Sequence, residues 1–228
     1  MKVPSHSAAY PPEYFDTDPV VLARSLLGSV LVRPLQDGRV MSGRVVEIEA
    51  YDCPRDPSCL AGRFHAAKSM ELAAPPGRFV FWVAYRHPLL QITCRPEGVA
   101  ASVLIRALEP LSGIDAMLEN RPVVRELGLT SGPAKLVQAM GLAPQFRGAV
   151  VNGAGLYLVP GEAVPDGRVQ VTARVGIQEG RNLPWRFCEA GSRWLSSGRP
   201  SMALVAHTVR QVPGGREEVP GGTDLSDP

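Results

Sequence analysis

Long hydrophobic stretches are absent from this sequence. No run of eighteen or more apolar residues occurs, and the first residues, MKVPSHSAAYPPEY, lack the apolar core of a secretory signal peptide. We therefore expect no membrane span and no export, and hence a cytoplasmic protein. The 228-residue chain is 45% hydrophobic and 20% charged. This composition is typical of a globular protein and excludes a disordered or fibrous chain.

Cysteine is also scarce. The four cysteines, Cys53, Cys59, Cys94 and Cys188, are too few for a disulfide scaffold, so we expect free or buried thiols. Two of them lie in one segment with His65, but five residues separate each neighbouring pair, a spacing that matches no standard zinc motif. The sequence thus predicts no metal. It also contains no GxGxxG or GxxxxGK[ST] element, so no nucleotide cofactor is implied.

Lysine is nearly missing among the basic residues. Only Lys2, Lys68 and Lys135 are lysines, so 21 of the 24 basic residues are arginines. The planar guanidinium group suits phosphates and base edges, although a genome rich in G and C would give the same bias. The net charge is only +2, which by itself does not indicate a polyanionic partner.

Both ends of the chain have few apolar anchors. Residues 1–12 are polar and rich in proline, and residues 211–228 combine glycine, proline and acidic residues. We expect both segments to be flexible and to lie outside the core. Residues 13–210 contain no repeat and no low-complexity linker, which predicts a single domain.

Strands and helices follow one another without regular alternation. Capping residues and helical periodicity predict helices at 18–28, 111–120 and 130–141, the last with Thr130 or Ser131 as its cap. Runs of β-branched and aromatic residues predict strands at 29–35, 43–51, 78–85, 89–94, 102–110, 155–160 and 168–177. Residues 52–76 are expected to form a long loop. This order predicts an α+β fold with an antiparallel or mixed sheet flanked by helices.

The predicted strand at 43–51 gathers polar side chains on one face. Alternation places Glu47, Glu49 and Tyr51 on that face. The opposite face carries apolar side chains: Val46, Ile48 and Ala50. A single glutamate at such a position is usually solvated. Two carboxylates beside apolar walls, however, can have different pKa values, as acid–base catalysis requires.

Aromatic residues crowd the predicted hairpin at 78–94. Phe79, Phe81 and Trp82 fit ordinary core packing. Tyr85 differs, because it falls at the predicted tip beside three residues that are hard to bury with it: Arg86, His87 and Pro88. An exposed ring flanked by cations is suited to separating stacked bases.

Six segments of the chain occur in a characteristic order. They are LARSLLGSVLVR, GRVVEIEAYDCPRDP, PGRFVFWVAY, VLIRALEPLSG, LTSGPAKLVQAM and ARVGI. In this order and spacing they resemble the alkyladenine (3-methyladenine) DNA glycosylases, and EAYDCP, RALEP and SGPAKL together make the resemblance highly specific. It implies a single domain with a curved sheet and a protruding hairpin, similar to the carboxy-terminal domain of formyltransferases. It also implies a monomer that needs no cofactor and acts on double-stranded DNA containing damaged bases.

The resemblance implies roles for individual residues. The damaged nucleotide is flipped out of the duplex, Tyr85 fills the gap, and Glu49 activates a water that attacks the sugar C1′. Arg106 and the main-chain carbonyl of Val175 hold this water. An alkylated purine is cationic and leaves readily, so one carboxylate can suffice. With no lysine expected near Glu49, no lyase activity is expected.

The resemblance also implies a base pocket. Its residues here are Ala50, Tyr51, Leu60, Trp82 and Thr93. Trp82 replaces a tyrosine that stacks on the base, Leu60 replaces a histidine that donates a hydrogen bond, and Thr93 falls near an asparagine that helps to reject guanine. We expect 3-methyladenine and 7-methylguanine to be good substrates, while the sequence leaves hypoxanthine undecided.

Three basic side chains are the expected DNA contacts next to Tyr85, namely Arg86, His87 and Lys135. Lys135 lies at the start of a predicted helix, where cations and helix N-termini both favour phosphate, although it could equally be an ordinary exposed lysine. Two other functions stay open. The fold could bind nucleic acid without catalysis, or it could hydrolyse nucleosides or small glycosides with Glu47 and Glu49.

Overall fold

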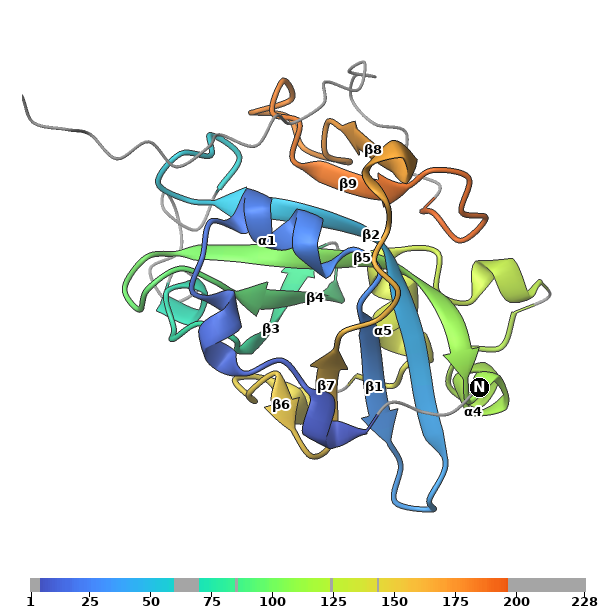
Figure 1. The fold of residues 1–228 in the computed structure, drawn as a ribbon. Helices are drawn as coiled ribbons and strands as arrows, with labels where there is room; N and C mark the ends of the chain where they lie inside the picture. The colour runs from blue at the N-terminus through green and yellow to red at the C-terminus, as the bar shows by residue number, and fades with distance from the viewer. Residues whose placement is uncertain (1–4, 60–69, 85, 124, 143, 197–228) are drawn as a thin grey trace, which may run out of the picture.

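The structure is a computed structural model, and it describes residues 5–59, 70–84, 86–123, 125–142 and 144–196. Within these residues, a nine-stranded sheet curls around a hydrophobic core that the helices help to build (Figure 1). Every strand pair of the sheet is antiparallel. The α+β fold predicted from the sequence is therefore confirmed, and the sheet is antiparallel rather than mixed.

The strands are numbered in chain order. They are β1 (Val30–Pro34), β2 (Val40–Asp52), β3 (Phe79–Ala84), β4 (His87–Thr93), β5 (Ala101–Ser112), β6 (Asn152–Gly153), β7 (Leu156–Val159), β8 (Val169–Thr172) and β9 (Arg186–Glu189). In the sheet they lie in the order β3-β4-β5-β2-β1-β7-β6, with β9 beside β2 and β8 beside β9.

The sheet is accompanied by the helices α1 (Pro19–Leu26), α4 (Ile114–Asn120) and α5 (Pro133–Ala139). Short 3₁₀ helices occur at His6–Ala8, Pro12–Phe15, Glu126–Gly128, Pro144–Phe146 and Asp166–Arg168. In the described part of the chain, no helix has the length and apolar character needed to cross a membrane.

Local signals explain where α1 begins and ends. Asp18 is its N-cap, and the carboxylate accepts a hydrogen bond from the Val20 N–H at 2.9 Å. The chain turns away at Gly28, whose φ of +94° disfavours residues with side chains. A Cβ at Gly28 would also collide with the carbonyl oxygen of Glu162. The helix predicted at 18–28 is therefore confirmed.

The start of α5 differs from its prediction. Its N-cap is Gly132, and Pro133 takes the first helical position, so the predicted caps Thr130 and Ser131 are wrong. The Thr130 hydroxyl instead donates to the Leu108 carbonyl at 2.6 Å. This bond ties the segment before α5 to β5 and competes with a capping role.

β2 is the strand at which the sheet branches. One of its edges pairs with β5. On the other edge, the first part of β2 pairs with β1, whereas Glu47–Glu49 pairs with β9. A β-bulge between Val45 and Ile48 lies where the partner changes. This bulge and the branch hold the middle of β2 between three strands.

The bulge changes which side chains share a face of β2. Val45, Ile48 and Ala50 contribute to the main core, whereas Val46 packs in a separate cluster with Ala107. The predicted alternation, which placed Val46 on the face of Ile48, is therefore wrong at this residue. A bulge inserts one extra residue and shifts the side-chain alternation by one position.

β3 and β4 form the predicted hairpin, with a shorter connection than expected. The register pairs Ala84 with His87, so the connection is two residues long. His87 and Pro88, predicted to lie in the turn, belong to β4 instead. Arg86 adopts a φ of +69°, as a tight connection requires. Tyr85, predicted at the tip, lies outside the described residues.

Part of the N-terminal segment packs against the sheet. The Tyr10 N–H donates to the Leu158 carbonyl at 2.9 Å, and the Tyr10 hydroxyl bonds to that of Ser29 at 3.0 Å. Residues 5–12 therefore do not lie apart from the core as predicted, because an aromatic anchor holds them on β7. Residues 1–4 and the predicted tail at 211–228 are outside the described residues.

Two cysteines are joined, which corrects the prediction of free thiols. Cys53 and Cys59 form a disulfide, and their Cα atoms are 4.9 Å apart. Two successive turns, closed by the Arg55 N–H and the Cys59 N–H, bring them together after β2. Cys94 and Cys188 are free and buried.

Candidate active site

A cavity of about 520 Å³ lies beside the polar face of β2. Its wall comes from β2, from the β3–β4 hairpin and β5, from the start of α5, and from the segment after β8. Apolar groups form most of the wall, and this volume suits one small organic ligand. The polar residues that line it include Tyr51, Gln91, Arg106, Lys135 and Ser196.

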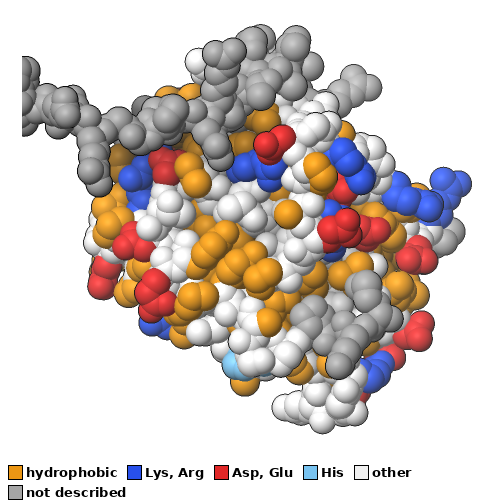
Figure 2. Space-filling view, viewed as in Figure 1, with side chains coloured by type: hydrophobic (Ala, Val, Ile, Leu, Met, Phe, Trp, Pro, Cys, Tyr) orange, Lys and Arg blue, Asp and Glu red, His pale blue; other side chains and the backbone are white. Residues whose placement is uncertain are grey.

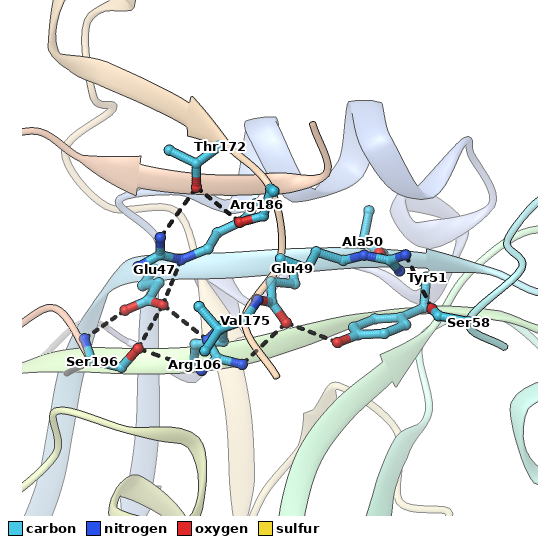
Figure 3. Close-up of polar contacts among 12 residues, drawn as sticks. Glu47, Glu49, Ala50, Tyr51, Ser58, Arg106, Thr172, Val175, Arg186 and Ser196 are labelled. Atoms are coloured by element: carbon cyan, nitrogen blue, oxygen red, sulfur yellow. Dashed lines mark hydrogen bonds and ion pairs between the residues drawn. The ribbon is translucent and has the colours of Figure 1, made fainter. Parts of the chain in front are cut away.

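Glu49 lies buried behind this wall with no exposed surface. Its Oε1 accepts a hydrogen bond from the Val175 N–H at 2.8 Å. Its Oε2 accepts one from the Tyr51 hydroxyl at 2.8 Å and one from Arg106 Nη1 at 3.1 Å (Figure 3). All three donor residues line the cavity, so the structure brings together Glu49, Arg106 and Val175, the three residues predicted to act in catalysis.

The strand predicted at 168–177 ends early, and this places Val175. β8 stops at Thr172, and the following residues leave the strand in a bend and reach Glu49 on β2. Sequence alternation alone gave no signal for the bend. The bend turns the main chain of Val175 toward Glu49, and Gly176 follows with a φ of +76°.

The charges around Glu49 keep its partners in their donor forms. Burial and the nearby charge of Glu49 raise the pKa of Tyr51 well above its usual value, so the phenol keeps its proton. Burial opposes the charge of Arg106, but Glu49 and Glu47 outweigh it and raise the pKa of this guanidinium. Among the described residues Oε1 accepts one hydrogen bond, and a carboxylate oxygen can accept a second, for example from a water molecule.

Glu47 binds the same arginine from the neighbouring position on β2. Its Oε1 accepts hydrogen bonds from Arg106 Nε at 2.9 Å and Arg186 Nε at 2.8 Å (Figure 3). The Ser196 backbone N–H donates to Glu47 Oε2 at 2.6 Å, and the Ser196 hydroxyl donates to Glu47 Oε1 at 2.8 Å. Glu47 is fully buried, so this network fixes the position of Arg106.

The charge state of Glu47 bears on the nucleoside or glycoside hydrolase alternative. Burial favours the neutral form, but the charges of Arg106 and Arg186 and the bonds from Ser196 outweigh it and hold the pKa of Glu47 below its usual value. A general acid needs a raised pKa. Glu47 is therefore unsuited to donate a proton, and Glu49 is left as the carboxylate that adjoins the cavity.

Arg174 and Asp56 form a buried ion pair that packs against the ring of Tyr51. The guanidinium of Arg174 lies 4.5 Å from the centroid of the Tyr51 ring. Arg174 Nη2 donates to Asp56 Oδ1 at 2.7 Å, and Nη1 donates to the Ala50 carbonyl at 2.9 Å. Ala50, predicted as a pocket residue, thus contributes its carbonyl to this support, and its side chain lies in the main core.

Two aromatic residues and an amide line the cavity. Tyr51 and Trp82, both predicted for the pocket, are in its wall. Thr93 is not, since it is fully buried and its hydroxyl donates to the Pro75 carbonyl at 2.7 Å. Gln91, two residues earlier on β4, lines the cavity instead. Counting back from Arg106 across the loop between β4 and β5 gave the wrong position.

The segment after β2 closes one end of the cavity. Ser58 and Cys59, held by the disulfide with Cys53, line it. The predicted pocket residue Leu60 lies outside the described residues, and so does His65. Over the described ranges, no group of three or more histidine, cysteine, aspartate or glutamate side chains could hold a metal ion.

The predicted DNA contacts lie at the mouth of the cavity or beside it. His87 is exposed, and both His87 and Lys135 line the main cavity and an adjoining hollow that Arg121 also lines. Arg86 is exposed next to them on the hairpin. On the face that carries α1, by contrast, acidic and basic side chains are interspersed among hydrophobic ones (Figure 2).

Several residues of the site were not predicted from the sequence. They are Gln91, Asp56, Arg174, Arg186 and Ser196. Four of them act through contacts with residues more than a hundred positions away, which local patterns do not reveal. The one signal for the buried charges at Asp56 and Arg174 was their place within two of the quoted segments, GRVVEIEAYDCPRDP and ARVGI.

Known proteins resemble this chain over most of its length. Residues 13–193 match the model of the family described as "Methylpurine-DNA glycosylase (MPG)". A Deinococcus radiodurans protein named "Putative 3-methyladenine DNA glycosylase" is 62% identical over 187 residues, which are 81% of this chain and 98% of that protein. Proteins with the same name from Gloeobacter violaceus and Chlorobium luteolum are 42% and 38% identical, over 81% and 83% of this chain and 85% and 97% of theirs.

Proposed function

The chain belongs to the methylpurine-DNA glycosylase family, and from this membership we propose that it releases alkylated purines from double-stranded DNA by hydrolysing the N-glycosidic bond. The observation that carries the proposal is Glu49. It is a buried carboxylate whose three donors line a cavity of the right size for one base. The substrates that we propose are the cationic lesions 3-methyladenine and 7-methylguanine.

In this proposal the damaged nucleotide leaves the duplex and its base enters the cavity between Tyr51 and Trp82. Both rings offer the apolar faces on which a flipped base stacks. Unstacking costs a few kcal/mol, which the exposed hairpin would offset by filling the gap in the duplex. The hairpin residue predicted for this role is Tyr85, and Arg86 beside it is a predicted DNA contact.

Glu49 then accepts a proton from a water that attacks C1′ of the sugar. Oε1 of Glu49 already accepts a hydrogen bond from the Val175 N–H, and the carbonyl of the same residue is the proposed second acceptor for that water. As the bond to the base breaks, positive charge develops on the sugar, and the carboxylate stabilises it. Arg106 and Tyr51 hold Glu49 in place through their hydrogen bonds to Oε2.

Replacing Glu49 with glutamine tests the proposal directly. Glu49→Gln keeps the shape of the side chain but removes the base, so we expect base release to fall at least about 100-fold. The measurement is release of free base from methylated duplex DNA under single-turnover conditions, with an inosine-containing duplex alongside. DNA binding and the melting temperature are measured on the same samples.

Glu119→Gln is the matched control, because Glu119 is exposed and forms a salt bridge with the surface residue Arg39. It should release base at the wild-type rate. Full activity of Glu49→Gln would disprove the role of Glu49. If the wild type binds the duplex but releases no base, the non-catalytic binding alternative becomes the better account.

We also propose that the enzyme is monofunctional. Lys135 lines the same cavity, contrary to the expectation that no lysine lies near the site, so the point needs a test. The groups that contact Glu49 are a phenol, a guanidinium and a backbone N–H, and none of them forms a Schiff base. Borohydride should therefore trap no covalent complex with DNA, and a trapped complex that Lys135→Gln abolishes would contradict this.

A further inference from the structure

The buried ion pair between Arg174 and Asp56 carries an inference about the charge of the base. Arg174 has no exposed surface, and neither has the Asp56 side chain. The two are joined by hydrogen bonds from Nη1 and Nη2 to the two carboxylate oxygens, at 2.5 and 2.7 Å. Such a pair is costly to bury, and none of the steps proposed above uses it.

The position of Arg174 relative to Tyr51 indicates what the ion pair does. Its guanidinium lies 4.5 Å from the centroid of the Tyr51 ring. Tyr51 lines the cavity and Arg174 does not, so the guanidinium lies on the side of the ring away from the cavity. A base stacked on the cavity side, at a van der Waals separation of about 3.5 Å, would be about 8 Å from this positive charge.

The charge of Arg174 is permanent. Burial opposes it, but the hydrogen bonds and the negative charge of Asp56 outweigh burial and raise the pKa of Arg174. An uncompensated cation at about 8 Å would repel a cationic base. At an effective dielectric constant of about 20, Coulomb's law gives a loss of affinity on the order of tenfold or more. A neutral base would be affected far less.

We propose that Asp56 is a specificity residue that compensates Arg174 behind Tyr51 and so allows the cavity to accept a cationic base. This rests on the proposed function. Ser58 assists, because its N–H and hydroxyl donate to Asp56 Oδ1 at 2.9 and 2.8 Å and hold the carboxylate in place. Arg174 and Asp56 touch no substrate in this proposal and act through the ring of Tyr51.

Binding to two uncleavable duplexes tests the proposal. One duplex carries 2′-fluoro-7-methylguanosine, whose base is cationic, and the other carries 2′-fluoro-inosine, whose base is neutral. The measured quantity is the ratio of the two dissociation constants. Asp56→Asn keeps the size of the side chain and removes its charge, so we expect the ratio to move about tenfold against the cationic duplex.

Two further variants separate charge from structure. Arg174→Met leaves Asp56 as an uncompensated anion, so the ratio should move in the opposite direction, toward the cationic duplex. The double variant Asp56→Asn with Arg174→Met has no charge at either position and should return the ratio to within about threefold of wild type. Glu189→Gln is the matched control, because it removes a buried carboxylate that pairs with Arg44 away from the cavity, and it should leave the ratio unchanged.

The outcomes are distinct. If every folded variant weakens binding of both duplexes equally, the pair is merely structural and the proposal is overturned. If Asp56→Asn does not fold, as melting would reveal, the opposite shift of Arg174→Met decides the question alone. Because no turnover is needed, an enzyme that releases no base from methylated DNA would refute the proposed function while the binding ratio still tests the role of Asp56.

Discussion

Arg106 lies between two carboxylates of β2 and binds each through a different nitrogen atom. Its Nε faces Glu47 and its Nη1 faces Glu49. Glu47 has further donors from Arg186 and Ser196, so it serves as the fixed anchor of the arginine, whereas Glu49 keeps accepting capacity for a water. Two identical residues two positions apart thus have separate tasks because the partners of each differ.

Removing the charge of Glu47, which anchors Arg106, should lower the free energy of unfolding. We expect Glu47→Gln to lower the free energy of unfolding at pH 7 by about 3 kcal/mol, since it leaves buried arginines without their carboxylate. The folded-state pKa of Glu47 lies below its usual value of 4.5. Its contribution is therefore present above that value and is lost as the pH falls through the folded pKa.

Chemical denaturation at pH 7 and at pH values below 4 checks this expectation, because the difference between variant and wild type should shrink in acid. Glu109→Gln is the control. Glu109 is partly exposed and its nearest charge partner, Arg44, is 3.7 Å away, so its loss should cost less than about 1 kcal/mol. A difference for Glu47→Gln that is independent of pH would contradict the assigned charge state.

At the scale of elements, the turn after α1 and the segment after β7 approach each other closely, at Gly28 and Glu162. Gly28 ends α1 with a φ of +94°, and its missing Cβ leaves room for the Glu162 carbonyl. We expect Gly28→Ala to lower the free energy of unfolding by about 3 kcal/mol, from backbone strain and the collision together. Thermal or urea unfolding measures it.

Gly38→Ala is the matched control, because Gly38 also has a positive φ, of +85°, but a Cβ there would meet nothing within 4 Å. It should cost only the strain, about 1 kcal/mol. Equal losses for the two variants would show that the contact with Glu162 contributes nothing.

Elements with a strong local signal were predictable. The helix at 18–28 has an aspartate cap and a glycine stop, and the hairpin at 78–94 has two β-branched runs around a short connection, so local residues specify both. The bulge at Val46 was not predictable, because it arises where β2 changes partner from β1 to β9. β9 itself is four residues long and is stabilised by pairing with β2 and β8, which its own sequence does not reveal.

The same distinction holds within the site. Glu49 and Tyr51 stand out because alternation along one strand groups them, and the resemblance to a family added Arg106 and Val175. Gln91 was missed because the loop between β4 and β5 upset the count. Asp56 and Arg174 were missed because an ion pair between residues 118 positions apart leaves no local pattern.

At the scale of the whole molecule, the face that carries α1 and the face at the cavity differ in how readily their basic side chains can bind DNA phosphates. Arg24 on α1 pairs with Asp166, whereas Lys135 and His87 lie at the cavity. We expect Lys135→Gln to weaken binding of undamaged duplex DNA and to reduce the slope of log K against log salt concentration by about 0.9. Titrations at several salt concentrations measure the slope.

Arg24→Gln removes the same charge from α1, and it should leave the slope unchanged. An equal reduction by both variants would mean that DNA responds only to net charge and does not bind at the cavity face. The comparison therefore locates the DNA surface without using catalysis.

The contacts that complete the site span almost the whole described chain. Glu49 needs the N–H of Val175, 126 positions later, and Glu47 needs Ser196, 149 positions later. During synthesis on a ribosome, β2 therefore emerges long before the residues that position its two carboxylates. A nascent or prematurely terminated chain that stops before Val175 would contain Glu49 and Tyr51 but lack the N–H that binds Glu49, and it would also lack Arg186 and Ser196, which bind Glu47. Activity is thus withheld until the chain is nearly finished, and incomplete products would be inert toward the chromosome.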